Sequence, residues 1–185
     1  MRDPLEVVVL MGPPGTGNSY IGNRLSERGI ASYLEIEPLI VEKFGSDLES
    51  QAAEVGAYLW RSYRQQLKDA EGVVVFESAG IADRPLHEYF DNTYRTARVL
   101  VNADRSLCID RDVARGPSKN ISHTRDRDLL GRPYDWGQAT IAPSYDYVLT
   151  LDGGDCERAI ADLQGLLAVK GSHPNVSPPI KTSPD

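Results

Sequence analysis

Val7–Tyr20, with the sequence VVVLMGPPGTGNSY, is the stretch that decides how this chain folds. The apolar run Val7–Leu10 is typical of a strand buried in a parallel sheet. Gly12, Gly15 and Gly17 come next, and such a glycine-rich turn can point its bare backbone amides at an anion. A polar segment that can start a helix follows the glycines. We therefore expect a strand, a phosphate-binding turn and a helix in direct succession.

The glycine spacing matches a known phosphate-binding pattern with one departure. Gly12, four further residues and Gly17 are followed by Asn18 and Ser19, where the P-loop pattern G-x-x-x-x-G-K-[ST] has a lysine and a hydroxyl residue. The Ser19 hydroxyl occupies the position that joins the ligands of Mg²⁺. A purely structural glycine turn is the alternative. The residues expected to bind the nucleotide are Gly12, Pro13, Pro14, Gly15, Thr16, Gly17, Asn18, Ser19 and Tyr20.

Asn18 separates nucleotide binding from phosphoryl transfer. Its neutral amide cannot supply the positive charge that a lysine carries to the transferring phosphate, and such a charge can be worth roughly 10³ or more in rate. Arginines could replace it, although a solvated helix face is the other interpretation of the arginine-rich region in this chain. The arginines that could reach the phosphates are Arg111, Arg115, Arg125, Arg127 and Arg132.

The composition restricts the class of protein. The chain has 185 residues and a formal net charge of −7, which argues against nucleic-acid or membrane partners because both attract positive charge. Cys108 and Cys156 are too few and too far apart for a disulfide framework or a metal site. We see no cleavable leader pattern and no apolar run near the roughly 18 residues of a membrane span. We therefore expect a cytoplasmic protein.

Apolar, strand-like runs alternate with helical patterns along the chain. This alternation predicts an α/β fold of three layers, α/β/α, with a five-stranded parallel sheet and helices on both faces. Residues 1–170 would form one domain, with a lid at about residues 116–143 that is rich in Gly, Pro, Asp and Arg, and residues 171–185 a disordered tail. The expected strands are residues 6–11, 31–36, 73–76, 97–102 and 145–151, and the expected helices are residues 19–28, 38–44, 46–69, 85–91, 104–114 and 155–169.

Three acidic residues are predicted at the carboxyl edge of this sheet, where parallel sheets bind their ligands. Glu77 follows the apolar run Val73–Phe76 and could hold a Mg²⁺-bound water or accept a proton from an attacking hydroxyl. Glu35 and Glu37 would project on the same side of an extended backbone and could orient or deprotonate an acceptor hydroxyl. Solvated carboxylates, or acids that decorate a helix N-terminus, are the alternatives.

Two arginines lie on the long helix that is expected before the third strand. Arg61 and Arg64 are three residues apart, so they share one face of this helix and could pair with an anionic or hydroxylated acceptor. The neighbouring Trp60 and Tyr63 are assigned to the core. His87 has no companion ligands at metal spacing and is assigned to the surface.

Several short segments together resemble the small P-loop kinases, in particular the shikimate-kinase-like and adenylylsulfate-kinase-like enzymes. The resemblance implies a P-loop nucleoside triphosphate hydrolase/kinase fold that uses ATP and Mg²⁺. All such enzymes are expected to carry the lysine that Asn18 replaces. The segments are GPPGTGNS, the ExE of Glu35–Glu37, WRSYR, CIDRDVAR and YDYVLTLDGG.

The same resemblance suggests roles for individual residues. In shikimate-kinase-like proteins an aspartate pair after the second strand contacts acceptor hydroxyls, which would fall on Glu35 and Glu37, and an arginine after an aromatic residue falls on Arg61. The glycine triplet that this family carries after its third strand is absent here. In the adenylylsulfate-kinase-like group a lid closes over ATP and arginines move onto the phosphates, which would assign that work to Arg111 and Arg115. The order of Cys108, Arg111, Asp112, Pro133 and Tyr134 matches that group.

The sequence thus favours an ATP-dependent phosphotransferase that acts on a hydroxyl of a small molecule. Ser19 and Glu77 would organise Mg²⁺, and lid arginines would neutralise the phosphates. Two alternatives stay open: a nucleotide-binding pseudokinase that acts as a sensor or interaction protein, because of Asn18, and a nucleoside or nucleotide kinase, because the basic helix would suit a phosphorylated acceptor. No local motif identifies the acceptor or the oligomeric state.

Overall fold

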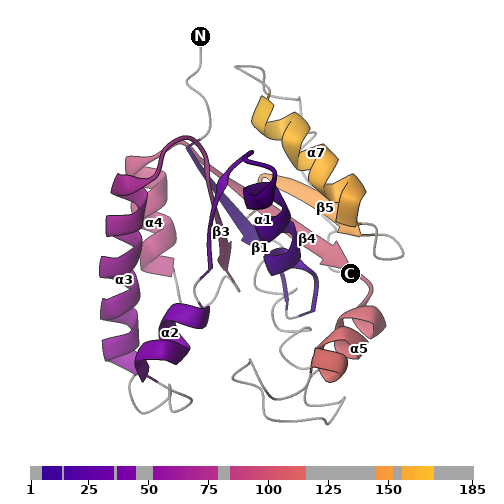
Figure 1. Cartoon of the computed structure of the whole chain (residues 1–185), viewed down its shortest axis with the longest axis horizontal. Helices are drawn as coiled ribbons and strands as arrows, with labels where there is room; N and C mark the ends of the chain where they lie inside the picture. Colours follow the sequence, from indigo (N-terminus) through magenta and orange to yellow (C-terminus); the bar gives the residue numbers. More distant parts are fainter. Residues whose placement is uncertain are drawn as a thin grey trace, which may run out of the picture.

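The computed structural model shows a five-stranded parallel sheet between two layers of helices (Figure 1). The strand order is β2-β3-β1-β4-β5. The structure describes residues 6–13, 15–35, 37–44, 52–78, 84–115, 145–151 and 156–168. The strands are β1 (Val7–Met11), β2 (Ser32–Leu34), β3 (Val74–Ser78), β4 (Thr96–Ala103) and β5 (Tyr147–Leu151). The helices are α1 (Asn18–Glu27), α2 (Glu37–Phe44), α3 (Ala52–Asp69), α4 (Arg84–Thr93), α5 (Arg105–Arg115) and α7 (Cys156–Ala168).

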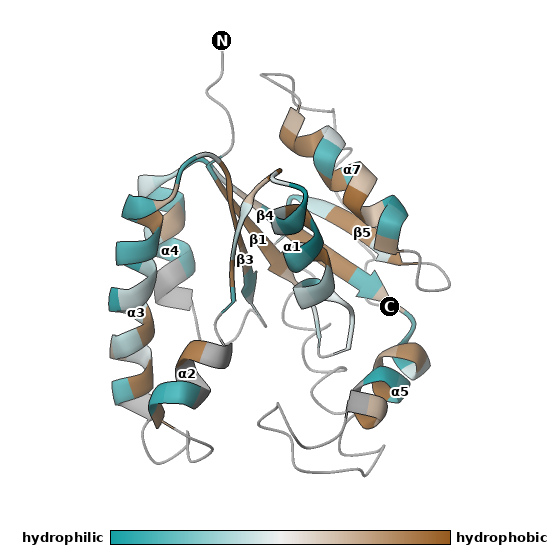
Figure 2. Cartoon of the chain, viewed as in Figure 1, coloured by the Kyte–Doolittle hydropathy of each residue, from teal (hydrophilic) through white to brown (hydrophobic). Residues whose placement is uncertain are grey.

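β1 is the central strand, and its side chains pack alternately into the cores on the two faces of the sheet. Val8 and Leu10 belong to the core beneath α1 and α7, whereas Val7, Val9 and Met11 belong to the core beneath α3 and α4. All of them are buried. Because side chains alternate along a strand, a strand between two helical layers must be apolar at every position. Figure 2 shows these strands in brown between helices that turn teal residues outward.

The core beneath α1 and α7 is aliphatic. Ile21 and Leu25, four residues apart on α1, share this core with Ile160 and Leu163 of α7. The packing of Ile21 and Leu25 therefore fixes α1 against the sheet. This packing holds the turn that precedes α1 in place against the sheet.

The core beneath α3 and α4 is aromatic. The ring of Phe76 on β3 meets Tyr63 of α3 and Phe90 of α4 edge to face, with ring centroids 4.7 and 5.5 Å apart. Tyr63 is fully buried, as the sequence predicts, and Trp60 is half-buried at the margin of the same cluster. Such aromatic pairs add stabilisation beyond the area they bury.

The parallel register places the carboxyl ends of β1 and β3 at one level, beside the middle of β4. Met11 at the end of β1 pairs with Ser78 of β3 and Leu100 of β4, and Leu10 pairs with Glu77. The glycine-rich turn therefore starts beside Glu77. Figure 1 shows α2 and α5 beyond this same edge, on the side to which the strand arrows point.

The predicted three-layer fold and its five parallel strands are confirmed. The second strand is shorter than expected, because β2 ends at Leu34 and Glu37 is already the first residue of α2. The expected extended backbone through Glu37 is therefore wrong; the proline at position 38 instead suits the first turn of a helix. The predicted lid at 116–143 and tail at 171–185 lie outside the described residues. Within the described part of the chain, no helix has the length and apolar character needed to cross a membrane.

Candidate active site

The turn after β1 is tightly built around its glycines. Gly15 and Gly17 have φ angles of 82° and 105°, a left-handed region that glycine adopts without strain. A Cβ at Gly15 would lie 2.2 Å from the carbonyl oxygen of Cys108 on α5, so no side chain fits there. Thr16 Oγ1 donates a hydrogen bond of 2.8 Å to the carbonyl oxygen of Pro13, which closes the turn internally.

α1 begins directly after this turn. Its first turn carries no acidic side chain, and Gly17, the residue before it, has no side chain that could cap the helix. The N-terminus of a helix carries partial positive charge and backbone N–H groups without a partner inside the helix. Together with the glycine-rich turn, it forms a site with the donors that bind phosphate.

Asn18, the first residue of α1, folds its side chain back over the turn. Its Nδ2 atom donates a hydrogen bond of 3.4 Å to the carbonyl oxygen of Gly12. Its Oδ1 atom is buried and has no hydrogen-bond partner among the described residues. The Asn18 side chain thus brings hydrogen-bonding groups to the turn but no charge.

Ser19 and Glu77 meet where α1 faces the end of β3. Ser19 Oγ donates a hydrogen bond of 2.8 Å to Glu77 Oε2. The structure therefore brings together the two residues that the sequence proposes as metal ligands. Hydroxyl and carboxylate oxygens are the donor atoms that Mg²⁺ prefers. The described residues contain no group of three or more His, Cys, Asp or Glu side chains that could hold a metal by themselves.

Tyr33 of β2 reaches the same place. Its ring packs on Gly22 of α1, where a Cβ would lie 2.3 Å from the ring. Burial, and then the negative charges of Glu77 and Glu35, raise the pKa of the Tyr33 hydroxyl, while the nearby Ser19 hydroxyl lowers it. No hydrogen bond of normal geometry joins this buried hydroxyl to a described residue. Sequence reasoning missed Tyr33, although a glycine inside a helical pattern can indicate such a close approach.

Arg111 reaches the glycine-rich turn from α5. Its Nη1 atom lies 3.2 Å from the carbonyl oxygen of Gly15 and 3.5 Å from that of Thr16, and donates to both. Burial raises the pKa of the nearby Cys108 thiol to about 11, although the charge of Arg111 lowers it. The structure thus places Arg111 at the turn, where it donates to backbone carbonyls, and its action on phosphates stays a prediction. Arg115 is the last residue of α5, and its side chain lies outside the described set.

A cavity of about 360 Å³ lies between α2 and α3. The Nζ atom of Lys43 lies 4.2 Å from the centre of the Tyr58 ring, and the rings of Phe44 and Tyr58 meet edge to face at 5.5 Å. Two cations and one carboxylate beside an aromatic wall suit a small anionic ligand. The residues that line the cavity are Lys43, Phe44, Glu54, Ala57, Tyr58 and Arg61.

The two arginines predicted to act together are separated. Arg61 lines the cavity between α2 and α3. The guanidinium carbon of Arg64 lies 5.9 Å from the ring centre of Trp60 and 5.3 Å from that of Tyr89, so this side chain covers aromatic rings of α3 and α4. The shared helix face therefore does not bring Arg64 to the cavity.

His87 is not the surface residue that the sequence indicates. It is half-buried, and its Nε2 atom lies 3.0 Å from Oγ of Ser78, the last residue of β3. Ser78 is 5 % exposed. The contact depends on how α4 packs over the sheet, and a single histidine in the sequence carries no signal of it.

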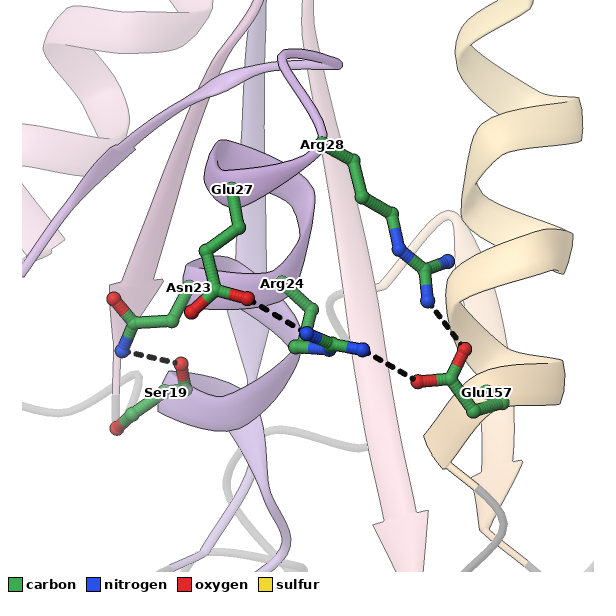
Figure 3. A network of polar contacts seen from close by, with 6 residues as sticks. All are labelled: Ser19, Asn23, Arg24, Glu27, Arg28 and Glu157. Carbon is green, nitrogen blue, oxygen red and sulfur yellow. Dashed lines mark hydrogen bonds and ion pairs between the residues drawn. The ribbon is translucent and has the colours of Figure 1, made fainter.

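The C-terminal half of α1 is tied to α7 by ion pairs (Figure 3). Glu157 of α7 lies 2.5 Å from an Nη atom of Arg28 and 3.5 Å from one of Arg24. Arg24 also pairs with Glu27 at 2.8 Å. Exposed ion pairs contribute little to stability individually. This network therefore belongs to the scaffold and not to the candidate site.

The remaining predicted residues are only partly described. Tyr20 is 48 % exposed at the start of α1, and Glu35 is half-buried after β2. Pro14, the side chain of Glu37 and the arginines Arg125, Arg127 and Arg132 lie outside what the structure describes.

Comparison with curated proteins gives a partial match. No family model matches this sequence. The chain is 32 % identical over 68 residues to the shikimate kinase of Xanthomonas euvesicatoria pv. vesicatoria, which covers 37 % of this chain and 38 % of that protein. It is 34 % identical over 61 residues to the shikimate kinase of Xanthomonas oryzae pv. oryzae, which covers 33 % and 34 %. The matched segment thus spans little more than a third of these relatives.

Solved structures share the fold over nearly the whole chain. A shikimate kinase from Bacteroides thetaiotaomicron has a TM-score of 0.66 at 18 % identity and covers 88 % of this chain and 98 % of its own. A deoxyadenosine kinase from M. mycoides with bound dATP has a TM-score of 0.56 at 14 % identity and covers 86 % and 97 %. At such identities the likeness shows the fold alone, a five-stranded parallel sheet between two layers of helices.

Proposed function

We propose that this protein is an ATP-dependent kinase that transfers a phosphoryl group to a hydroxyl of a small molecule. The observation that carries the proposal is the Ser19–Glu77 hydrogen bond of 2.8 Å, made at the point where the glycine-rich turn becomes α1. A phosphate-binding turn next to a hydroxyl and a carboxylate is the arrangement that kinases of this fold use. The local likeness to shikimate kinases supports the same class.

The glycine-rich turn would hold the phosphates of ATP. Gly15 and Gly17 keep the backbone in a left-handed turn, and the N-terminus of α1 adds its partial positive charge. The chain's own contribution here is backbone N–H donors fixed in place. Such donors need no reorganisation when a phosphate arrives.

Mg²⁺ is the metal that the donor atoms fit. Ser19 Oγ and the Glu77 carboxylate are both oxygen donors at one point of the site. When bound, Mg²⁺ would neutralise charge on the phosphates. Glu77 could instead accept the proton of an attacking hydroxyl, since its carboxylate lies at the same edge of the sheet.

The cavity between α2 and α3 is the proposed place of the acceptor. Arg61 and Lys43 would pair with an anionic group on it, and the Tyr58 ring would pack against its apolar part. Glu35 and Glu37 follow β2 at the same edge of the sheet and would orient or deprotonate the acceptor hydroxyl. Residues 116–143 would form a lid over both ligands.

The positive charge at the phosphates would come from a different residue than in the P-loop pattern. Asn18 stands where the P-loop pattern has lysine, so its side chain adds no positive charge. Arg111 is held 3.2 Å from the Gly15 carbonyl, which keeps a guanidinium next to the turn. Arg111, with Arg115 and the lid arginines, would supply part of the positive charge that the lysine of the P-loop pattern provides.

ATP turnover by the native chain and by Asn18→Lys tests the proposal. We expect the native chain to phosphorylate at least one member of a panel of hydroxylated carboxylates and nucleosides. The lysine variant should then turn over ATP faster, by up to roughly 10³. Asn18→Lys combined with Glu77→Gln is the matched control and should lose the gain. If neither the native chain nor the lysine variant turns over ATP, the kinase proposal is wrong.

A nucleotide-binding pseudokinase is the second candidate, and Asn18 is the residue that favours it. In that case the native chain would bind ATP without turnover, while Asn18→Lys alone would acquire hydrolysis. The same two proteins in the same assay therefore separate the candidates. Phosphorylation of nucleosides in the panel, and not of carboxylates, would identify a nucleoside kinase instead.

A further inference from the structure

Three side-chain oxygens meet at the start of α1. Ser19 Oγ donates to Glu77 Oε2 at 2.8 Å. Tyr33 pairs in register with Val75, so its side chain lies on the same face of the sheet as that of Glu77, and its buried hydroxyl makes no hydrogen bond of normal geometry to a described residue. A buried tyrosine hydroxyl normally has a partner. Tyr33 therefore has an unused donor beside the proposed metal ligands.

The packing around the Tyr33 ring restricts the positions that its hydroxyl can reach. A Cβ at Gly22 would lie 2.3 Å from the ring, so α1 confines it on one side. On the other side, Tyr33 pairs in register with Val75 of β3, two residues before Glu77. Glycine at position 22 is what lets the ring lie this close to α1. The sheet and the helix together hold the hydroxyl next to the Glu77 side chain.

The hydroxyl keeps its proton at neutral pH. The ordinary pKa of a tyrosine hydroxyl is about 10. A neutral phenol can donate to a carboxylate but is a poor substitute for a carboxylate as a metal ligand. The Tyr33 hydroxyl is therefore better suited to donate a hydrogen bond to Glu77 than to bind the metal directly.

We propose that Tyr33 is a positioning residue, whose hydroxyl donates to the Glu77 carboxylate and fixes its orientation when Mg²⁺ and nucleotide bind. The inference rests on the proposed function, because it assigns Glu77 to the metal. Residues that orient a metal ligand in this way commonly change metal affinity by 10-fold or more when they are removed.

Tyr33→Phe tests this role, with Tyr63→Phe as the matched control. Both variants remove one buried phenol oxygen, but Tyr63 lies in the aromatic core on the opposite face of the sheet. The thermal unfolding midpoint is followed while MgCl₂ is titrated at saturating ADP, and ADP is titrated separately in EDTA. We expect Tyr33→Phe to raise the half-saturating Mg²⁺ concentration on the order of 10-fold and to leave ADP binding in EDTA unchanged. Tyr63→Phe should change neither quantity.

The unfolding midpoint without ligands separates a positioning role from a structural one. Removing a hydroxyl that has no partner should not lower that midpoint, so Tyr33→Phe is expected to fold as well as the native chain. Unchanged Mg²⁺ dependence in Tyr33→Phe, or an equal loss of ADP binding in EDTA, would overturn the inference while leaving the kinase proposal intact. If the native chain itself shows no Mg²⁺-dependent ADP binding, both fail.

Discussion

The Nη1 atom of Arg111 donates a hydrogen bond of 3.2 Å to the carbonyl oxygen of Gly15, 96 residues earlier in the chain. The carbonyl of Cys108, one helical turn before Arg111, lies against the same glycine, where a Cβ would come within 2.2 Å of it. α5 thus holds the glycine-rich turn by one charged side chain and one close backbone contact. A helix from the second half of the chain fixes the shape of a turn in the first.

Arg111→Ala should weaken nucleotide binding. The substitution removes two charge-assisted hydrogen bonds to the turn and a positive charge beside it, and we expect ATP affinity to fall roughly 10-fold. Arg111→Lys keeps the charge without the rigid fork and should give a smaller loss. Arg105→Ala, at the exposed start of the same helix, is the control and should leave affinity unchanged. Calorimetry with Mg-ATP measures all three, and an unaffected Arg111→Ala would show that nucleotide binding does not depend on the Arg111 side chain.

Gly22→Ala should destabilise the fold. The added methyl group would meet the ring of Tyr33 at 2.3 Å, and overpacking of this kind costs about 1–3 kcal/mol. Gly56→Ala on α3 is the matched control, because its Cβ would meet nothing within 4 Å. Alanine in place of glycine inside a helix should stabilise that variant by roughly 0.5–1 kcal/mol. Urea unfolding gives both values, and a Gly22→Ala variant as stable as the native chain would mean that the ring moves freely.

The buried thiol of Cys108 should make stability fall at alkaline pH. Burial raises its pKa in the folded chain from 9.0 to about 11, so the unfolded chain loses this proton first as the pH rises. The thiol's contribution is therefore complete below about pH 9 and is lost as the pH approaches 11. Unfolding free energies at pH 8 and pH 10 measure the loss. Cys108→Ala should show a smaller loss between these pH values than the native chain, and an equal loss in both would exclude the thiol as its cause.

The fold could be predicted because its signals are local. The run Val7–Leu10 is typical of a strand covered on both faces, and the three glycines after it indicate a turn. The sequence also proposed Ser19 and Glu77 together as Mg²⁺ ligands, and the structure shows a hydrogen bond between them although 58 residues separate them. Both residues were assigned to strand or helix ends at one edge of a parallel sheet, and the fold brings such ends together.

The rest of the site depends on packing that no local pattern encodes. Tyr33 reaches Glu77 because β2 lies next to β3 in the sheet, an order that the sequence does not reveal. Arg61 and Arg64 share a helix face, yet Arg61 lines the cavity and Arg64 packs over the ring of Tyr89 on α4. A three-residue spacing shows that two side chains are neighbours, but the packing around the helix decides where each one points.

Calorimetric titration of the native chain with Mg-ATP is the most direct test of the phosphate site on which the kinase proposal depends. We expect saturable binding of one nucleotide per chain at concentrations below about 1 mM, with weaker binding when EDTA removes Mg²⁺, because Ser19 and Glu77 lie 2.8 Å apart beside the glycine-rich turn. The absence of any saturable binding at millimolar Mg-ATP would contradict the phosphate site, and with it the proposed kinase.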